Sequence, residues 1–160
     1  MPGDHVDLLL KQWQEVKPNI DCSPMAVIGR LARINSLMMK GLNPIFEEVE
    51  LSHVEFDILA SLRRNKVKMT PTELYKGLML SSGAMSTRLD NLVHRGLIER
   101  QLSEHDRRSC TVELTASGIK LIDRAVAAHV ANEKQLLAPL NQSEQKKLAA
   151  LMRKWLLAHE

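Results

Sequence analysis

Aromatic residues are scarce in this chain of 160 residues, since Phe, Trp and Tyr together make up 3% of it. A β-sandwich core depends on aromatic and β-branched side chains, so this scarcity disfavours that fold. The apolar residues, 44% of the chain, are largely Leu, Met, Val, Ile and Ala, which suit packed helices. We therefore expect a mostly helical protein.

The chain also lacks several signatures of other protein classes. Its two cysteines, Cys22 and Cys110, form no CxxC pair and have no histidine cluster at zinc-ligand spacing beside them, so we expect reduced thiols and no metal site. No apolar run approaches the roughly 20 residues of a membrane span, and the N-terminus has no signal-peptide core. We expect a cytoplasmic protein that does not bind a membrane.

Motifs of common enzymes are absent as well. The sequence has no phosphate-binding glycine loop, no GxSxG and no HExxH, so we expect neither an enzyme nor a cofactor. The net charge of +3 permits binding to nucleic acid but does not require it.

Helical periodicity and capping signals define the order of elements. Capping boxes or N-caps occur at Asp4, Ser23, Ser52, Thr70, Ser81, Thr115 and Asn141. We expect Asn43-Pro44 to end the second helix. The expected helices cover residues 4–17, 23–40, 52–64, 71–78, 82–95, 116–138 and 142 onward, with a short strand at 67–69 and a hairpin of strands 97–102 and 110–114.

A short helix, a tight turn, a second helix and a hairpin follow one another between Thr70 and Leu114. This order predicts a winged helix-turn-helix that binds double-stranded DNA, with the second helix in the major groove. Arg107 and Arg108 at the hairpin tip are expected to reach the minor groove. The side chains expected at the DNA from the second helix are Ser81, Ser82, Ala84, Met85, Ser86 and Thr87.

Each of these features has an ordinary structural explanation. Serines at a helix start commonly serve only as caps, and arginines at a hairpin tip are commonly only solvated. Because both features occur together and in this order, we favour the DNA-binding interpretation.

Several of these residues also carry a family resemblance. The segment Ser81 to Arg100, then Asp106-Arg107-Arg108 and Val112 to Gly118, resemble the MarR family. The resemblance implies a single domain over 1–160, with dimerisation helices at 4–42 and 116–159 and a winged-helix lobe at 52–114. It also implies a homodimeric repressor that binds a pseudopalindromic operator and is released by a small molecule.

A narrower resemblance links the chain to the urate-responsive, PecS-like branch of that family, through Trp13 and the segments 20–31 and 55–64. It implies that Trp13, Asp57, Arg88 and Arg100 bind urate or another anionic aromatic molecule. An indole stacks on a flat purine, guanidinium forks bind its anionic edge, and the Asp would hold one Arg. The alternatives stay open: Trp13 as a core or interface residue, Arg88 as a phosphate contact, and Asp57 as solvated or structurally paired.

Two other functions compete with a ligand-responsive regulator. A redox-sensing regulator would use Cys22, because a thiol near a helix start can have a lowered pKa. Cys110 is the weaker candidate on its strand, and the single tyrosine, Tyr75, disfavours a phenol-assisted thiolate. A DNA-architectural protein without a ligand is the third hypothesis, and the extra helix with Trp13 argues against it.

Overall fold

The computed structural model describes residues 3–65, 68–78, 82–102 and 110–160, without the side chains at 82, 84 and 102. It divides into two compact units, Met1–Asn43 and Pro44–Glu160. Among the described residues, no helix has the length and apolar character needed to cross a membrane.

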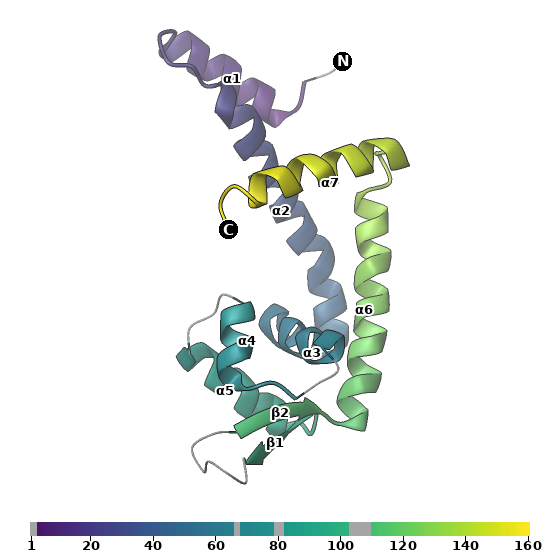
Figure 1. Cartoon of the computed structure of the whole chain (residues 1–160). Coiled ribbons are helices and arrows are strands. Elements are labelled where there is room, and N and C mark those ends of the chain that lie inside the picture. Colours follow the sequence, from purple (N-terminus) through teal and green to yellow (C-terminus); the bar gives the residue numbers. More distant parts are fainter. Residues whose placement is uncertain (1–2, 66–67, 79–81, 103–109) are drawn as a thin grey trace. The chain divides into compact units, whose positions relative to one another are not determined.

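Nine elements follow one another in the described part of the chain (Figure 1). The first unit contains α1 (His5–Val16) and most of α2 (Ser23–Glu48). The second unit contains the end of α2, followed by α3 (His53–Asn65), α4 (Pro71–Gly77), α5 (Ser82–His94), β1 (Ile98–Leu102), β2 (Cys110–Leu114), α6 (Ala116–Leu136) and α7 (Gln142–Leu156). This confirms the predicted mostly helical fold with a small β-wing.

Charged side chains join α1 to α2 within the first unit. The Asp4 carboxylate caps α1 by accepting the backbone N–H groups of Val6 (2.8 Å) and Asp7 (3.0 Å). Arg30 of α2 forms ion pairs with Asp4 (2.8 Å) and Asp7 (2.7 Å). The backbone hydrogen bond from Asp7, together with Arg30, lowers the pKa of Asp4. Val6 is buried at this junction, so the cap, the ion pairs and apolar packing act together.

The prediction that Asn43-Pro44 ends the second helix is wrong, because α2 continues through Pro44 to Glu48. Proline removes one helical hydrogen bond, but burial of the residues that follow compensates for that loss. Phe46 and Val49 are each 5% exposed and belong to the core of the second unit. The chain then turns at Glu50, whose φ of 53° is the left-handed conformation that permits a sharp exit from the helix.

Helix α3 lies at the centre of the second unit and contacts α5, β2 and α6 (Figure 1). Both phenylalanines of the chain meet there, with the rings of Phe46 and Phe56 5.2 Å apart. His129 of α6 stacks on Phe56 at 5.0 Å. The other fully buried side chains of this core include Ile58, Leu59, Leu74, Met85, Leu89, Leu92, Ile98, Val112 and Ile122.

The hairpin follows α5 directly and leads into α6. Strands β1 and β2 pair antiparallel, from Ile98 opposite Leu114 to Leu102 opposite Cys110. Gly96 has a φ of 65°, the left-handed conformation that glycine favours just after the end of a helix such as α5. The predicted strand at 67–69 is represented in the described residues by a single bridge between Met69 and Val112.

Candidate nucleic-acid interface

The short helix α4 is fixed at its start by a capping box. The Thr70 hydroxyl accepts the backbone N–H of Glu73 (3.2 Å), and the Glu73 carboxylate accepts the backbone N–H of Thr70 (2.7 Å). The backbone hydrogen bond from Thr70 is the main reason why the pKa of Glu73 is lowered. With Pro71 at its first position and Leu74 buried, α4 packs against α5 as the first helix of a helix-turn-helix.

Helix α5 has one buried face and one exposed face. Its buried side chains recur at helical spacing and are Met85, Leu89 and Leu92. Ser86, Thr87 and Arg88 lie on the exposed face. The Thr87 hydroxyl also donates back to the Gly83 carbonyl at 3.4 Å. The exposed face therefore offers small hydroxyl groups and one guanidinium to a partner.

Met85 was expected among the DNA contacts, but its side chain is only 1% exposed. In this protomer it packs in the core beneath the exposed face of α5, because apolar residues four and seven positions further along complete the same buried face. The expected contacts Ser81, Arg107 and Arg108 lie outside the described residues. Ser82 begins α5, and its side chain also lies outside the description.

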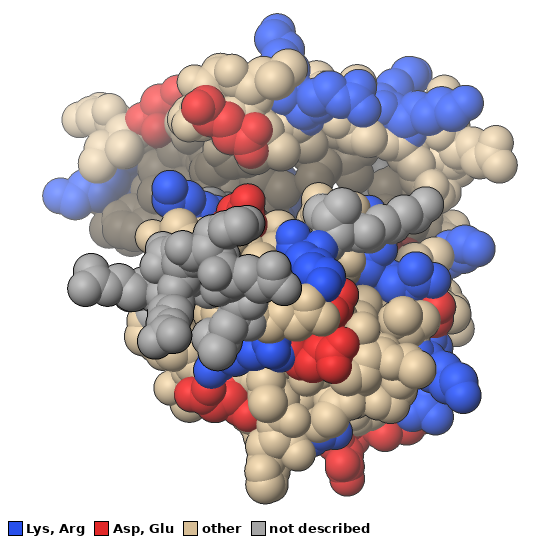
Figure 2. Space-filling view, turned by 60° about the horizontal axis from the view of Figure 1, so that its bottom comes forward, with Lys and Arg blue, Asp and Glu red and all other residues tan. Residues whose placement is uncertain are grey.

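The surface seen from the hairpin end carries both signs of charge (Figure 2). Lys68, shortly before α4, forms an ion pair with Glu113 of β2 (3.3 Å), and Gln101 of β1 lies between them with hydrogen bonds to both. The basic groups of this region are thus partly compensated. This region therefore offers individual donors and no uniform basic patch among the described residues.

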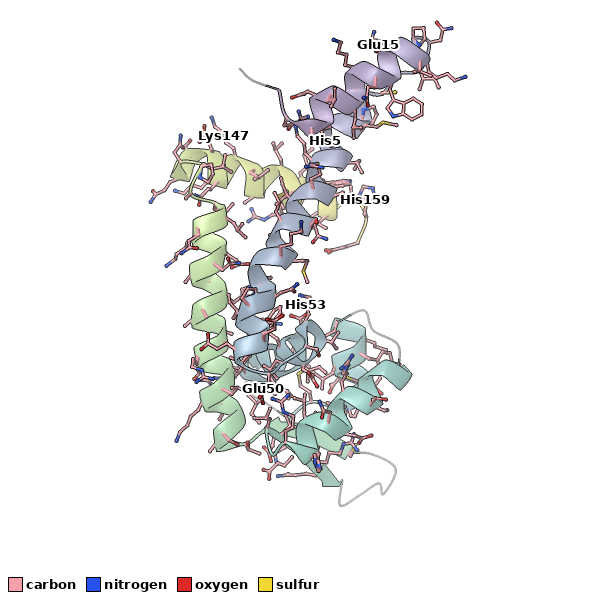
Figure 3. All side chains as sticks on the ribbon, turned by 180° about the vertical axis from the view of Figure 1, so that it is seen from behind. His5, Glu15, Glu50, His53, Lys147 and His159 are labelled. Atoms are coloured by element: carbon pink, nitrogen blue, oxygen red, sulfur yellow. The ribbon has the colours of Figure 1, made fainter. Side chains whose placement is uncertain are left out.

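The residues expected to bind an effector come from four elements in two units. Trp13 is 43% exposed on α1 of the first unit. In the second unit, Asp57 lies on α3, Arg88 on α5 and Arg100 on β1. Among the described residues, Asp57 pairs with His53 (3.6 Å), close to the α2–α3 turn labelled by Glu50 and His53 in Figure 3.

Arg100 has a partner that sequence reasoning did not identify. Its guanidinium forms an ion pair with Asp90 of α5 at 2.8 Å, so β1 is tied to the helix-turn-helix. The sequence interpretation had instead assigned an arginine to Asp57. Asp90 is exposed and lies outside any motif, so no pattern in the sequence distinguished it as the partner.

A second missed contact joins Asn91 to the buried carboxylate of Glu55. Glu55 is 3% exposed and caps α3 by accepting the backbone N–H (2.8 Å) and hydroxyl (2.7 Å) of Ser52. Its other carboxylate oxygen accepts a hydrogen bond from Asn91 of α5. Burial by itself raises the pKa of Glu55, but the hydrogen bonds from Ser52 and Asn91 and the nearby charge of Arg88 outweigh it and lower that pKa.

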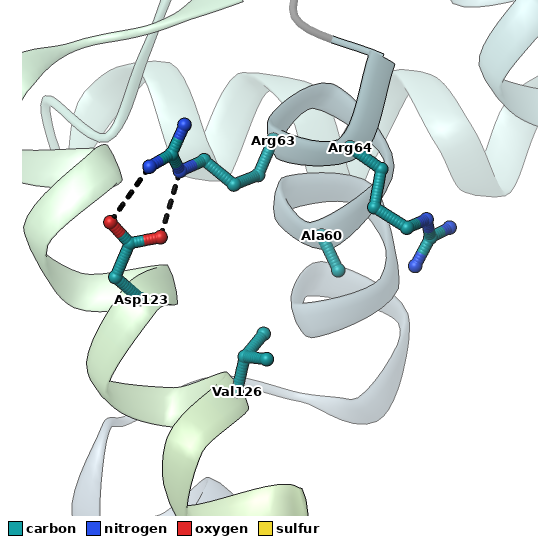
Figure 4. A pocket seen from close by; sticks show the side chains of 5 residues that line it. All are labelled: Ala60, Arg63, Arg64, Asp123 and Val126. Atoms are coloured by element: carbon teal, nitrogen blue, oxygen red, sulfur yellow. Dashed lines mark hydrogen bonds and ion pairs between the residues drawn. The ribbon is translucent and has the colours of Figure 1, made fainter.

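A pocket of about 380 Å³ lies between α3 and α6 (Figure 4). Arg63 reaches across its edge to Asp123, with hydrogen bonds of 2.7 and 3.0 Å between guanidinium and carboxylate. Ala60, Arg64 and Val126 complete the lining. The Arg63–Asp123 pair ties α3 to α6.

Comparison with known proteins agrees with this geometry. The model of the MarR family matches residues 50–109, which contain the helix-turn-helix and the start of the hairpin. The chain is 38% identical over 146 residues to the HTH-type transcriptional regulator PecS of Dickeya dadantii, covering 90% of this chain and 88% of that protein. The chain belongs to the MarR family.

Other MarR-family proteins extend the match. The multiple antibiotic resistance protein MarR of Escherichia coli is 32% identical over 98 residues, covering 61% of this chain and 67% of that protein. The structure of a mutant E. coli MarR with operator DNA superposes with a TM-score of 0.72 and 27% identity, over 90% of this chain and 97% of that chain. The apo form of wild-type E. coli MarR gives a TM-score of 0.69 and 29% identity, covering 80% and 95%. The winged-helix fold and the assignment as a transcriptional regulator follow from these matches.

Proposed function

We propose that this MarR-family regulator binds a pseudopalindromic operator as a homodimer and is a repressor released by a small anionic aromatic ligand. The two-faced helix α5 supports this proposal, because its buried face holds it in the lobe and its exposed face is available to a groove. Ser82, Ser86 and Thr87 of this helix would contact DNA together with Ser81, the residue before it in sequence, and Arg107 and Arg108 would do so from the wing. In the E. coli relative, the solved complex contains operator DNA.

Exposed apolar side chains support the homodimer. Helix α7 is described throughout and has no buried residue, and Trp155, Leu151 and Met152 on it are 44%, 66% and 42% exposed. Helix α1 likewise exposes apolar residues, among them Leu8 at 51%. An exposed apolar surface of this kind favours a partner that covers it, and a second copy is the commonest one. The dimerisation region would thus be 4–42 and 116–159, and the DNA-binding lobe 52–114.

The DNA-binding part of the proposal is tested by placing a carboxylate on the exposed face of α5. A duplex enriched by the wild type from a random-sequence library serves as probe, and its half-sites should lie about 10–10.5 base pairs apart. Ser86→Asp should lose at least about tenfold in affinity, because a carboxylate repels phosphate. Ser143→Asp at the start of α7 is the matched control and should bind like wild type. Wild-type affinity in Ser86→Asp would contradict the placement of α5.

For the effector, we propose that Trp13, Asp57, Arg88 and Arg100 bind the ligand, with urate as the first candidate. Two of the four residues lie on elements that would face DNA, so a ligand that contacts them can alter the position of those elements. A ligand shifts such an equilibrium only by its difference in affinity between the two states, so it must prefer the form that does not bind DNA. An anionic ligand at Arg100 would compete with Asp90 for the same guanidinium.

Calorimetric titration of urate tests this assignment, with release of the selected duplex measured in parallel. Trp13→Ala should weaken urate binding and leave DNA binding nearly unchanged, whereas Gln12→Ala, an exposed neighbour on the same helix α1, should retain urate binding. Equal urate affinity without Trp13 would exclude this residue set. If the wild type gives neither heat nor release at millimolar urate, the ligand is not urate, and oxidation of Cys22 becomes the next test.

A further inference from the structure

Helix α5 meets the rest of its unit through an apolar face and a few polar contacts. Its buried side chains, Met85, Leu89 and Leu92, form a regular stripe. Apolar contacts of this kind are non-directional, so they hold the helix in place without defining its rotation closely. Directional contacts narrow the rotation further than the apolar stripe does, and so define more closely which side chains face the groove.

The required accuracy follows from helix geometry. Side-chain tips lie about 5–6 Å from a helix axis, so a rotation of about 20° moves them by roughly 2 Å. Donor–acceptor distances in hydrogen bonds vary by only about 0.5 Å, so such a rotation would break contacts between α5 and base edges. Small errors in the rotation of α5 would therefore reduce discrimination between sequences before they reduce contacts to phosphates.

The Glu55–Asn91 hydrogen bond is directional and buried on the Glu55 side. One carboxylate oxygen of Glu55 is held by Ser52 at the start of α3, so the side chain has a fixed position. The other oxygen accepts a hydrogen bond from Asn91. Asn91 lies one turn or more after Ser86 and Thr87 on α5. Arg88, one turn before Asn91, adds an attractive charge toward the same carboxylate.

We propose that Glu55 is a positioning residue for sequence recognition: through Asn91 it sets the rotation of α5 on α3, and thereby the affinity ratio between operator and non-specific DNA. This inference rests on the proposed function in one respect, that α5 contacts the bases. Glu55 itself touches no DNA in this proposal. Loss of the Glu55–Asn91 hydrogen bond should therefore lower the ratio of affinities for operator and non-specific DNA. The salt dependence of binding, which counts phosphate contacts, should stay unchanged.

A polarity swap tests the proposal. Asn91→Asp places two carboxylates against each other, and Asn91→Ala removes the donor without adding a charge. The double variant Glu55→Gln/Asn91→Asp restores the hydrogen bond in reverse, since the new amide at position 55 donates to the new carboxylate at position 91. Its carbonyl oxygen still accepts from Ser52, as a glutamine does in a capping box.

The readout is the affinity of each variant for the duplex selected by wild type and for a scrambled duplex, at several salt concentrations, with the melting temperature measured alongside. Each single variant at position 91 should lower the affinity ratio by about tenfold or more, as expected when roughly one base is no longer read, and the double variant should recover most of it. Glu144→Gln is the matched control, because Glu144 caps α7 through Asn141 in the same way. The ratio of its affinities for the selected and the scrambled duplex should equal that of wild type.

Two results would overturn the inference while leaving the proposed function intact. One is a single variant at position 91 that has a lower melting temperature but an unchanged ratio of affinities for the two duplexes. That result would assign Glu55 a role in stability alone. The other is a double variant no more specific than Asn91→Asp. If the wild type itself selects no duplex, the proposed function and this inference fail together.

Discussion

The junction between the hairpin and α6 offers a sharp test of the fold, because it leaves no room for a side chain at Gly118. A Cβ atom there would lie 2.0 Å from the carbonyl oxygen of Leu97 and 3.3 Å from Cδ2 of Leu114. Carbon and oxygen normally approach no closer than about 3.3 Å. Gly118→Ala must therefore push backbone from backbone by more than about 1 Å.

The displacement also affects hydrogen bonds at the same carbonyl. Leu97 O accepts the backbone N–H of Thr115 at 3.1 Å and its hydroxyl at 3.2 Å. Overpacking costs about 1–3 kcal/mol and a broken hydrogen bond about 0.5–1.5 kcal/mol. Alanine regains about 1 kcal/mol over glycine in a helix. We expect the free energy of unfolding to fall by a net amount of about 2 kcal/mol, combining these terms.

Urea unfolding followed by circular dichroism measures this decrease, at one fixed protomer concentration because a dimer would make stability concentration-dependent. The melting temperature should fall by roughly 4–8 °C. Gly77→Ala is the control, since a Cβ at Gly77 meets nothing within 4 Å. If Gly118→Ala is as stable as Gly77→Ala, the described junction between β1 and α6 is incorrect.

Light scattering at micromolar concentration should give the mass of a dimer, and a stable monomer would contradict the proposed use of the exposed apolar helices. Arg107→Ala and Arg108→Ala should each weaken DNA binding and lower the salt slope by about one for every phosphate that is no longer neutralised; unchanged affinity at every salt concentration would exclude a wing contact. Because hydrogen bonds from Arg63 lower the pKa of Asp123 below its ordinary 3.8, the pair stabilises the fold above that pH and ceases to do so as pH falls through the lowered value. Asp123→Asn should thus melt below wild type at pH 7, with the difference in melting temperature shrinking as pH falls below 3.8, and a constant difference at all pH values would refute the role of this charge.

The order of the elements could be predicted because its signals are local. The capping box at Thr70, the left-handed Gly96 and the cap at Thr115 each depend on residues within a few positions, and all three occur in the structure. The continuation of α2 past Pro44 was not predictable in this way, since it depends on burial of Phe46 by residues distant in sequence.

The contacts around α5 were beyond sequence reasoning for a related physical reason. Asn91 and Glu55 are 36 residues apart, and a polar residue on a helix shows no periodic pattern that names its partner. The capping box correctly predicted one half of the role of Glu55, the bond to Ser52. Its second oxygen acquires a partner only when α5 packs on α3, which is a tertiary event.

Polar links along the second half of α5, and at Arg95 just after its end, bear on how an effector could act. They join the helix to β1, to α3 and to the α2–α3 turn, through Asp90–Arg100, Asn91–Glu55 and Arg95–Glu50 O. A ligand that captured Arg100 would remove the first link and leave the other two. The expected response is therefore a shift of the wing strand relative to α5, with α5 still held on α3. Release from DNA by such a ligand would then arise from a changed distance between wing and recognition helix, since those two elements must fit adjacent grooves of one duplex.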